Sequence, residues 1–168
     1  QGGGHGAGGR AGALMYIAGV VVLTVVLPLA LAIVDRFVMH APSGFLVLLA
    51  FWMAFWAGGV RLLMAGLRQT LRPELTTQQI FGIKGQEVLP VMREVGFANL
   101  AMGTLGVLSV LDRSLLVPAA LVSGLYYGFA GLGHLFQGGL NLKRRVAMLT
   151  DLWVFAVLAV YLASTFLF

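Results

Sequence analysis

A run of 22 residues from Ala13 to Val34 contains no charged side chain. At about 1.5 Å per residue, an α-helix of this length crosses the hydrocarbon core of a bilayer, which is about 30 Å thick. A signal peptide is the alternative interpretation, because Arg10 precedes the run and Ala30-Leu31-Ala32 resembles a cleavage site. The run is too long for the apolar region of a signal peptide. We therefore predict a transmembrane helix.

Four further apolar stretches follow this one. They run from Gly44 to about Leu67, from Gln86 to Leu111, from Ser114 to about Leu142 and from Val146 to Phe168. The third of the five is the weakest candidate for a span, since only its 17 residues from Val95 onward are uncharged. We expect an all-α polytopic bundle of about five spans, or of four if the first or third stretch does not cross completely. Residues 13–168 would form one transmembrane domain after a flexible Gly-rich tail over residues 1–12.

The composition excludes several other classes of protein. Of the 168 residues, 60% are apolar and 10% are charged, whereas roughly 25% of a soluble domain is charged. Cys is absent, which excludes a disulfide scaffold, a thiolate metal site and a Cys nucleophile. The GxSxG, HExxH and phosphate-loop motifs of soluble enzymes are absent as well. The sequence favours a protein that is not an enzyme.

Lys and Arg are distributed unequally between the two ends of the predicted spans. Of the 11, nine fall on one side, and only Arg36 and Arg113 fall on the other. Because cytoplasmic flanks collect positive charge, this split predicts a cytoplasmic N-terminus and an external C-terminus, in a bacterial inner membrane. The net charge of +5 then reflects topology and attraction to anionic lipids, and nucleic-acid binding is not expected. The nine are Arg10, Arg61, Arg68, Arg72, Lys84, Arg93, Lys143, Arg144 and Arg145.

Small residues recur at helical spacing in the third and fourth stretches. Such stripes let helices approach closely in lipid, so we predict that they face other helices; a hinge or a backbone that lines a path is the alternative. The third stretch also carries Glu87 and Glu94 on its opposite face, and we therefore expect it at the centre of the bundle. The stripes consist of Gly96, Asn99, Gly103 and Gly106, and of Gly124, Gly128 and Gly131.

Ionisable residues within the predicted spans are the candidates for function. A charged group at membrane depth costs a few kcal/mol and is usually paired or hydrated. Counted from the cytoplasmic end of each span, four such residues lie at a similar depth, roughly 8 to 12 Å inside the boundary. We predict one polar layer to which four helices contribute. Its members are Arg61, Glu94, His134 and Asp151, with Asn99 one turn deeper than Glu94.

Three roles fit this polar layer. In a structural role, Glu94 or Asp151 pairs with Arg61 or Arg93. In a second role, the two acids and His134 relay protons or handle an ion. In the third, Glu94, His134 and Asp151 supply ligands to a divalent metal, and no other cofactor is evident. For Asn99, an interhelical hydrogen bond is favoured over a contact with a substrate.

Three motifs resemble a known family. They are Arg93-Glu94-Val95-Gly96-Phe97-Ala98-Asn99-Leu100, the run from Tyr127 to His134, and Val146-Ala147-Met148-Leu149-Thr150-Asp151. Over residues 76–168 the chain resembles the small bacterial and archaeal membrane proteins grouped as DUF6790, a family of unknown function. The resemblance implies no activity. It implies that the signature positions are Glu94, Asn99, His134 and Asp151.

Three functions remain open on these grounds. The first is a small bundle that binds or passes an ion, a proton or a small solute, and the buried charges favour it. The second is a non-catalytic subunit of a larger membrane complex, which the small size favours. The third is a membrane-embedded metal enzyme. The expected partners are the lipid bilayer and either further copies of the chain or other membrane subunits.

The unequal distribution of Lys and Arg generates a test of orientation. Cysteines introduced at Ser43 and Ser114 should react with a membrane-impermeant thiol reagent in intact cells, whereas a cysteine at Gln78 should not. The chain has no Cys of its own, so each labelled site is unambiguous. The reverse labelling pattern would contradict the predicted orientation.

Overall fold

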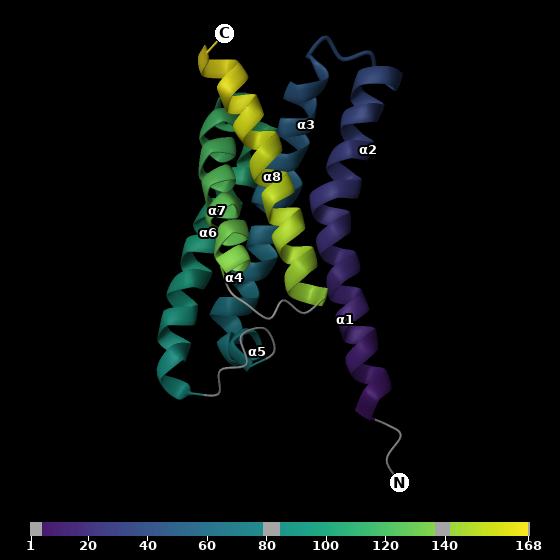
Figure 1. The fold of residues 1–168 in the computed structure, drawn as a ribbon. Helices are drawn as coiled ribbons and strands as arrows, with labels where there is room; N and C mark the ends of the chain where they lie inside the picture. The colour runs from purple at the N-terminus through teal and green to yellow at the C-terminus, as the bar shows by residue number, and fades with distance from the viewer. Residues whose placement is uncertain (1–4, 79–84, 137–141, 168) are drawn as a thin grey trace.

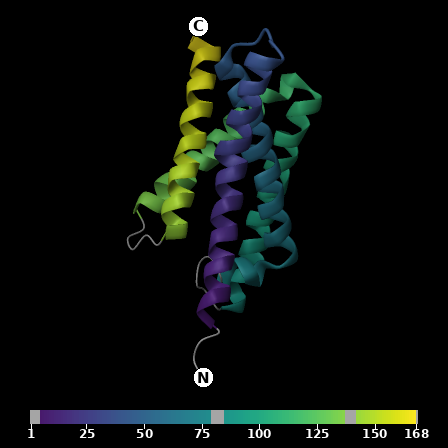
Figure 2. The ribbon, with the colours of Figure 1, turned by 90° about the vertical axis from the view of Figure 1, so that its right-hand side faces the viewer.

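The computed structural model is a bundle of long helices (Figures 1 and 2). It describes residues 5–78, 85–136 and 142–167, with side chains from residue 11 onward. Within these ranges there is no strand, and five helical stretches are long and apolar enough to cross a membrane. The predicted all-α bundle with five spans is confirmed, including the third stretch. The spans are Ala11–Val38, Phe45–Leu71, Gln86–Leu111, Arg113–Phe136 and Leu142–Leu167.

The first two spans contain π-helical segments. The first span consists of α1 (His5–Val21), η1 (Val22–Val26), α2 (Leu27–Ile33) and η2 (Val34–Val38). The second consists of α3 (Phe45–Met53), η3 (Ala54–Arg61) and α4 (Leu62–Leu71), and the short α5 (Pro73–Thr76) follows it. Because α1 begins at His5, it includes part of the segment that was expected to be a flexible tail. The other spans are η5 (Gln86–Val88) with α6 (Leu89–Leu111), η6 (Arg113–Leu115) with α7 (Leu116–Phe136), and α8 (Leu142–Leu167).

Local sequence explains two of the breaks between helices. Arg72 leaves the helical conformation, with φ −139° and ψ 63°, and Pro73 then begins α5. A residue before Pro is disfavoured in the helical region, so the break falls where the sequence requires it. At the end of α6, the carboxylate of Asp112 accepts a hydrogen bond of 2.9 Å from the backbone N–H of Ser114. Hydrogen bonds from the hydroxyl and backbone of Ser114 lower the pKa of Asp112, which therefore stays charged at the start of η6.

The second span, not the third, occupies the centre of the bundle. Of the residues in the most apolar 18-residue segment of the second span, 56% are buried inside the bundle, against 28% for the third span and 22% for the first. In the second span, α3 contacts α2 of the first span and α8 of the fifth. Its other segments, η3 and α4, contact α6 of the third span, and η3 also contacts α7 of the fourth. The prediction that the third span is central is wrong. Its acidic residues Glu87 and Glu94 are exposed, and only its small-residue face is buried.

The small-residue stripe of α6 lies directly against the second span. A Cβ atom added at Gly103 would lie 2.6 Å from the backbone nitrogen of Leu63, and one added at Gly106 would lie 2.5 Å from that of Gly59. Real Cβ atoms do not come this close to backbone atoms. The two helix backbones are therefore in contact, and the predicted packing role of this stripe is confirmed.

The second stripe lies between α7 and α8, where the contact is made to side chains. A Cβ atom at Gly128 would lie 2.8 Å from the ring of Phe155. At Gly124 the nearest atom is the Cβ of Leu158, at an ordinary distance of 3.4 Å. This stripe also faces another helix, as predicted, but its fit is looser at Gly124 than at Gly128.

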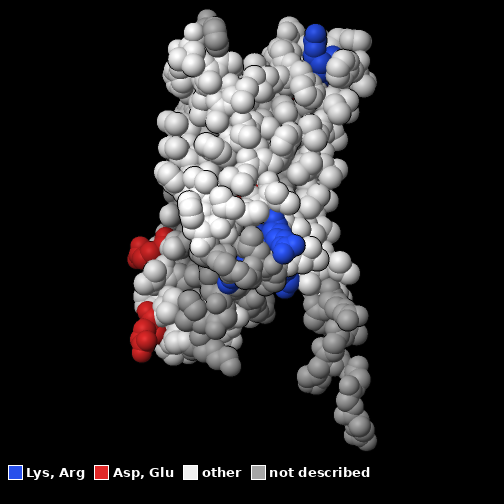
Figure 3. All heavy atoms as spheres, in the orientation of Figure 1, with Lys and Arg blue, Asp and Glu red and all other residues white. Residues whose placement is uncertain are grey.

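The two termini lie at opposite ends of the bundle (Figure 1), as an odd number of spans requires. On the face shown in Figure 3, charged residues gather toward the end that carries the N-terminus, and a broad zone above them is almost free of charge. Arg36, in the last turn of the first span, and Arg113, the first residue of the fourth, lie at the other end. An uncharged zone of this kind is what a multi-pass membrane protein presents to lipid.

The glycine geometry predicts a difference between two otherwise similar substitutions. Gly103→Ala should lower the free energy of unfolding by about 1 to 3 kcal/mol, because the new methyl group must push the backbone of the second span away. Gly124→Ala is the matched control, and it should be neutral or stabilising, since Ala favours the helix by up to about 1 kcal/mol over Gly. Thermal unfolding in detergent measures both changes. Equal stability of the two variants would contradict the backbone contact at Gly103.

Candidate functional site

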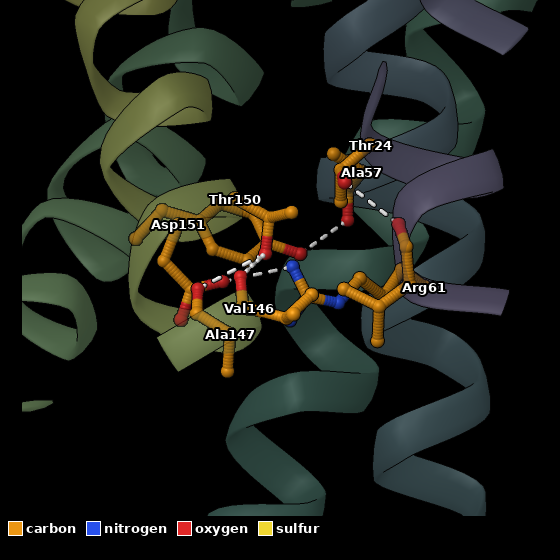
Figure 4. Close-up of polar contacts among 9 residues, drawn as sticks. Thr24, Ala57, Arg61, Val146, Ala147, Thr150 and Asp151 are labelled. Carbon is orange, nitrogen blue, oxygen red and sulfur yellow. Dashed lines mark hydrogen bonds and ion pairs between the residues drawn. The ribbon is translucent and has the colours of Figure 1, made fainter. Parts of the chain in front are cut away.

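An ion pair between Arg61 and Asp151 joins the second span to the fifth. Nη1 of Arg61 donates a hydrogen bond of 2.9 Å to Oδ1 of Asp151, and the side chains are 16% and 5% exposed. Figure 4 shows the guanidinium of Arg61 reaching from the second span toward α8. An unpaired charge at this depth would be costly, so the contact stabilises both residues against the apolar surroundings. Of the pairings considered for the polar layer, this is the one that forms.

Tyr127 of α7 lies beside the ion pair. Its hydroxyl donates a hydrogen bond of 2.6 Å to the carbonyl oxygen of Ala57 in η3. The guanidinium of Arg61 lies over the Tyr127 ring, with Cζ 5.0 Å from the ring centroid, a cation–π geometry. Three helical spans therefore fix the position of Arg61: the second carries it, the fourth supplies the ring and the fifth supplies the carboxylate.

A cavity of about 660 Å³ lies next to the ion pair, between the first span, α4, α7 and α8. Its wall combines apolar side chains with nine polar ones, and its volume lies in the range of small-molecule sites. Arg61, Tyr127 and Asp151 belong to this wall. We call this cavity the cleft. Its other polar residues are Tyr16, Arg68, Gln69, Thr76, Tyr126 and His134.

The two arginines of the cleft lie at different depths. Arg61 and Arg68 are seven residues apart on one face of the second span, which separates them by about 10 Å along the helix axis. Arg61 lies deeper in the span, and Arg68 lies near its end and is exposed. Arg61 and Arg68 carry two positive charges and Asp151 one negative charge, so the cleft has a net charge of one positive unit when His134 is neutral.

Two buried polar atoms of residues that line the cleft have no hydrogen-bond partner. They are Oγ1 of Thr76, whose residue is 3% exposed, and Nδ1 of His134. Buried polar groups almost always find a partner, either in the protein or in bound water. Because both residues line the cleft, a molecule inside it could supply the missing hydrogen bonds.

Asn99 lies outside the cleft wall and holds in place a residue that lines it. Its Nδ2 donates a hydrogen bond of 2.7 Å to Oε1 of Gln69, and Gln69 lines the cleft while Asn99, 0% exposed, does not. The contact joins α6 to α4. It agrees with the interhelical hydrogen bond that the sequence favoured for Asn99, and it makes Asn99 a positioning residue for Gln69.

The structure does not bring Glu94 to the cleft. A Cβ atom at Gly96 would lie 2.5 Å from the hydroxyl of Thr70, so this part of α6 lies opposite the last turn of α4. Thr70 is nine residues beyond Arg61, or about 13 Å along the axis. Glu94 is exposed and lies outside the layer of Arg61 and Asp151. The depth estimate is wrong for Glu94, because α6 extends further beyond the layer than the sequence suggested.

Without Glu94, the predicted metal ligands do not converge. His134 of α7 and Asp151 of α8 both line the cleft. Glu94 of α6 is exposed and does not line it. Among the residues in the described ranges, no group of three or more His, Asp or Glu residues could hold a metal ion. The part of the polar layer that forms is Arg61, Asp151 and His134.

A comparison with known families covers most of the chain. The model described as "Family of unknown function (DUF6790)" matches residues 18–165. The chain belongs to the DUF6790 family. This match confirms the resemblance over residues 76–168 and extends it to include most of the first span. No curated protein and no solved structure matches the chain.

Several cleft residues of this DUF6790 protein were not predicted from its sequence. Gln69 and Thr76 lie between the predicted second and third stretches, which end at about Leu67 and begin at Gln86, and Tyr126 was not singled out. One signal was present: Arg61 and Arg68 share a helix face with Gln69 close beside them, which indicates a polar surface along the end of the second span. The participation of α1 had no polar signal except Tyr16.

The ion pair predicts an unequal response to single and double substitution. In this DUF6790 protein, Asp151→Ala leaves Arg61 without its carboxylate, which should cost about 3 to 5 kcal/mol of unfolding free energy. The double variant Arg61→Met with Asp151→Leu removes both charges and should recover most of that loss. Asp151→Asn keeps the shape of the side chain and an acceptor oxygen, so its unfolding free energy should lie between those of Asp151→Ala and the double variant. Thermal unfolding in detergent measures the series, and wild-type stability of Asp151→Ala would contradict a structural role for the pair.

Proposed function

We propose that the cleft binds a small solute that carries an acidic group, and that Arg61 anchors this group. The observation that carries the proposal is the position of Arg61 in the wall of a cavity of about 660 Å³, held there by Asp151. A guanidinium has five N–H donors in a planar fork. One of them is donated to Asp151. Donors that neither Asp151 nor Tyr127 engages could bind a carboxylate or a phosphate, the groups that Arg binds best.

The charge of the cleft favours an anion over a cation. Arg68 carries a positive charge with no ion pair in the part of the chain that the structure describes, and it stands at the outer end of the cleft. The inner ion pair is neutral as a unit, so Arg68 gives the cleft its net charge. An anion would meet Arg68 first and then Arg61. The unpartnered atoms of Thr76 and His134 would add hydrogen bonds to a polar group between them.

Binding is favoured over an open passage, because the bundle is closely packed beyond Arg61. Toward the end that carries the C-terminus, Met53 and Ala57 of the second span face a core that also contains Val154 and Leu158 of α8. All four are 0% exposed. A solute could cross only if these side chains separated. The proposed activity is therefore capture of a solute from one side of the bundle.

We further propose that the cleft opens toward the cytoplasm of a bacterial cell. Support comes from the cations at that end of the bundle, which include Arg72 and the run from Lys143 to Arg145 at the start of α8. Positive flanks of this kind are typical of the cytoplasmic side.

A role as a subunit of a larger membrane complex is the second candidate. The exposed position of Glu94 on α6 favours it, since an exposed carboxylate on a spanning helix can form an ion pair with a neighbouring helix. Among the described residues Glu94 has no ion pair. A partner helix with a basic residue at the same depth would supply it.

Charged thiol reagents test the proposed anion preference. A cysteine at Ala130, in the wall of the cleft, should react faster with the anionic sulfonatoethyl methanethiosulfonate than with its cationic trimethylammonium analogue, after each rate is divided by that for a free thiol. Arg68→Gln should reduce this preference about fivefold, the size expected for one charge at about 10 Å in a partly hydrated site. Benzoate, a soluble carboxylate, should slow the reaction of the same cysteine with neutral N-ethylmaleimide.

The controls separate binding from charge alone. The double variant Arg61→Gln with Asp151→Asn keeps the net charge of the cleft, so it should keep the reagent preference and lose the protection by benzoate. A cysteine at Gln78, exposed and outside the cleft wall, should show no protection. The proposal is wrong if benzoate fails to protect position 130 and the cationic reagent reacts there as fast as the anionic one.

A further inference from the structure

Resting on the proposed function, we infer that the solute is a single-chain anionic amphiphile that enters the cleft sideways from the bilayer, between α1 and α4. The inference names the chemical class of the ligand and the route by which it arrives. It depends on the exposure of the cleft rim, on the apolar surface of α1 and on the position of the cations.

The rim of the cleft is exposed at membrane depth. Met15 of α1 and Met64 of α4 both line the cleft, and they are 75% and 60% exposed. Both residues belong to membrane spans, Ala11–Val38 and Phe45–Leu71. A side chain that is exposed there faces lipid, so each Met borders the cleft on one side and the bilayer on the other. A cleft that binds a water-soluble solute would not require apolar side chains exposed to lipid at its edge.

The seam between α1 and α4 is open. The main partner of α1 outside its own span is α8, and few contacts join it to α4. Figure 1 shows α1 diverging from the other helices toward its N-terminal end. A Cβ atom added at Gly19, which lines the cleft, would meet nothing within 4 Å. The slot beside Gly19 therefore has room for a hydrocarbon chain.

The side of this slot that the first span forms is apolar except for Tyr16. Val20 and Leu23 continue the surface that Met15 and Gly19 begin, and Met64 lies across from them in α4. Methionine side chains adapt to irregular apolar shapes, which suits a flexible chain. The acyl part of an amphiphile would lie along this surface and remain in contact with lipid at the rim.

The opposite wall carries the groups that would hold an acidic head. Arg61, the last residue of η3, lies near Tyr126 of α7, and Arg68 of α4 lies about two turns nearer the end of the span. An Arg near the end of a span extends its charge toward the lipid headgroups. Arg68 therefore stands where the head of a membrane-bound anion is found, and the head can pass from Arg68 to Arg61 while the chain stays in the seam.

A photoactivatable fatty acid tests this route. The wild-type chain in phosphatidylcholine vesicles is irradiated with palmitate that carries a diazirine in the middle of its chain, and the labelled peptides are mapped by mass spectrometry. Labelling at Met15 and Met64 should be saturable and should fall at least tenfold with excess palmitate, but not with acetate. Labelling at Phe129, which is 70% exposed and outside the cleft wall, should not saturate.

Two glycine variants serve as a matched pair in the same experiment. Gly19→Leu places a side chain in the slot, and its Cβ atom would meet nothing within 4 Å, so the fold should be kept and the saturable labelling lost. Gly12→Leu is the control, because Gly12 is equally open and lies outside the cleft wall. It should label like the wild type. Arg68→Gln should weaken the competition by palmitate about tenfold.

The outcomes distinguish this inference from the proposal on which it rests. If benzoate protects the cysteine at Ala130 while palmitate labelling does not saturate, the lateral route and the amphiphile are wrong and anion binding stands. The same conclusion follows if Gly19→Leu and Gly12→Leu label alike. If neither benzoate nor palmitate binds, both are wrong.

Discussion

Close contact between the backbones of α6 and the second span determines how the other helices are arranged. In lipid, apolar surface alone gives helices little reason to associate, so van der Waals packing must hold them together. Glycines at 103 and 106 remove the side chains that would keep the two backbones apart. The second span is thereby fixed at the centre, where it can contact every other span. Its buried position allows it to carry a charged residue at membrane depth.

The Arg61–Asp151 pair has a different part in the structure. It joins the central span to α8, and Tyr127 of α7 packs against the same guanidinium. The first span adds no charge to this group, and it closes the cleft only incompletely. Side-chain polar contacts thus join the other three walls next to the cleft, whereas the hydrogen bond of 2.7 Å from Nε1 of Trp52 to Asp35, which joins the first span to the second, lies near the other end of the bundle. Such a difference lets one side of a site open while the anchoring residue stays in place.

Much of the fold could be predicted from the sequence because its physical signals are local. Uncharged runs of sufficient length gave the five spans, and glycine spacing identified the packed faces of α6 and α7. The candidate site was predicted less well. Arg61, His134 and Asp151 were identified because each is ionisable within a span, but Glu94 was placed at the wrong depth. Depth depends on how two helices are shifted along each other, and contacts between backbones, not composition, determine this shift.

The π-helical segment η3 has a consequence for the direction in which Arg61 points. Each residue of an α-helix turns the chain by 100°, so one additional residue within a turn rotates everything after it by that angle. The segment spans Ala54–Arg61, and the glycines that contact α6 and the arginine that faces the cleft lie within it or follow it. In a straight α-helix of the same sequence, the spacing of the residues alone would fix the angle between the faces before and after this segment. The widened turns rotate the part of the span that follows them relative to α3, and this rotation contributes to the direction in which Arg61 points.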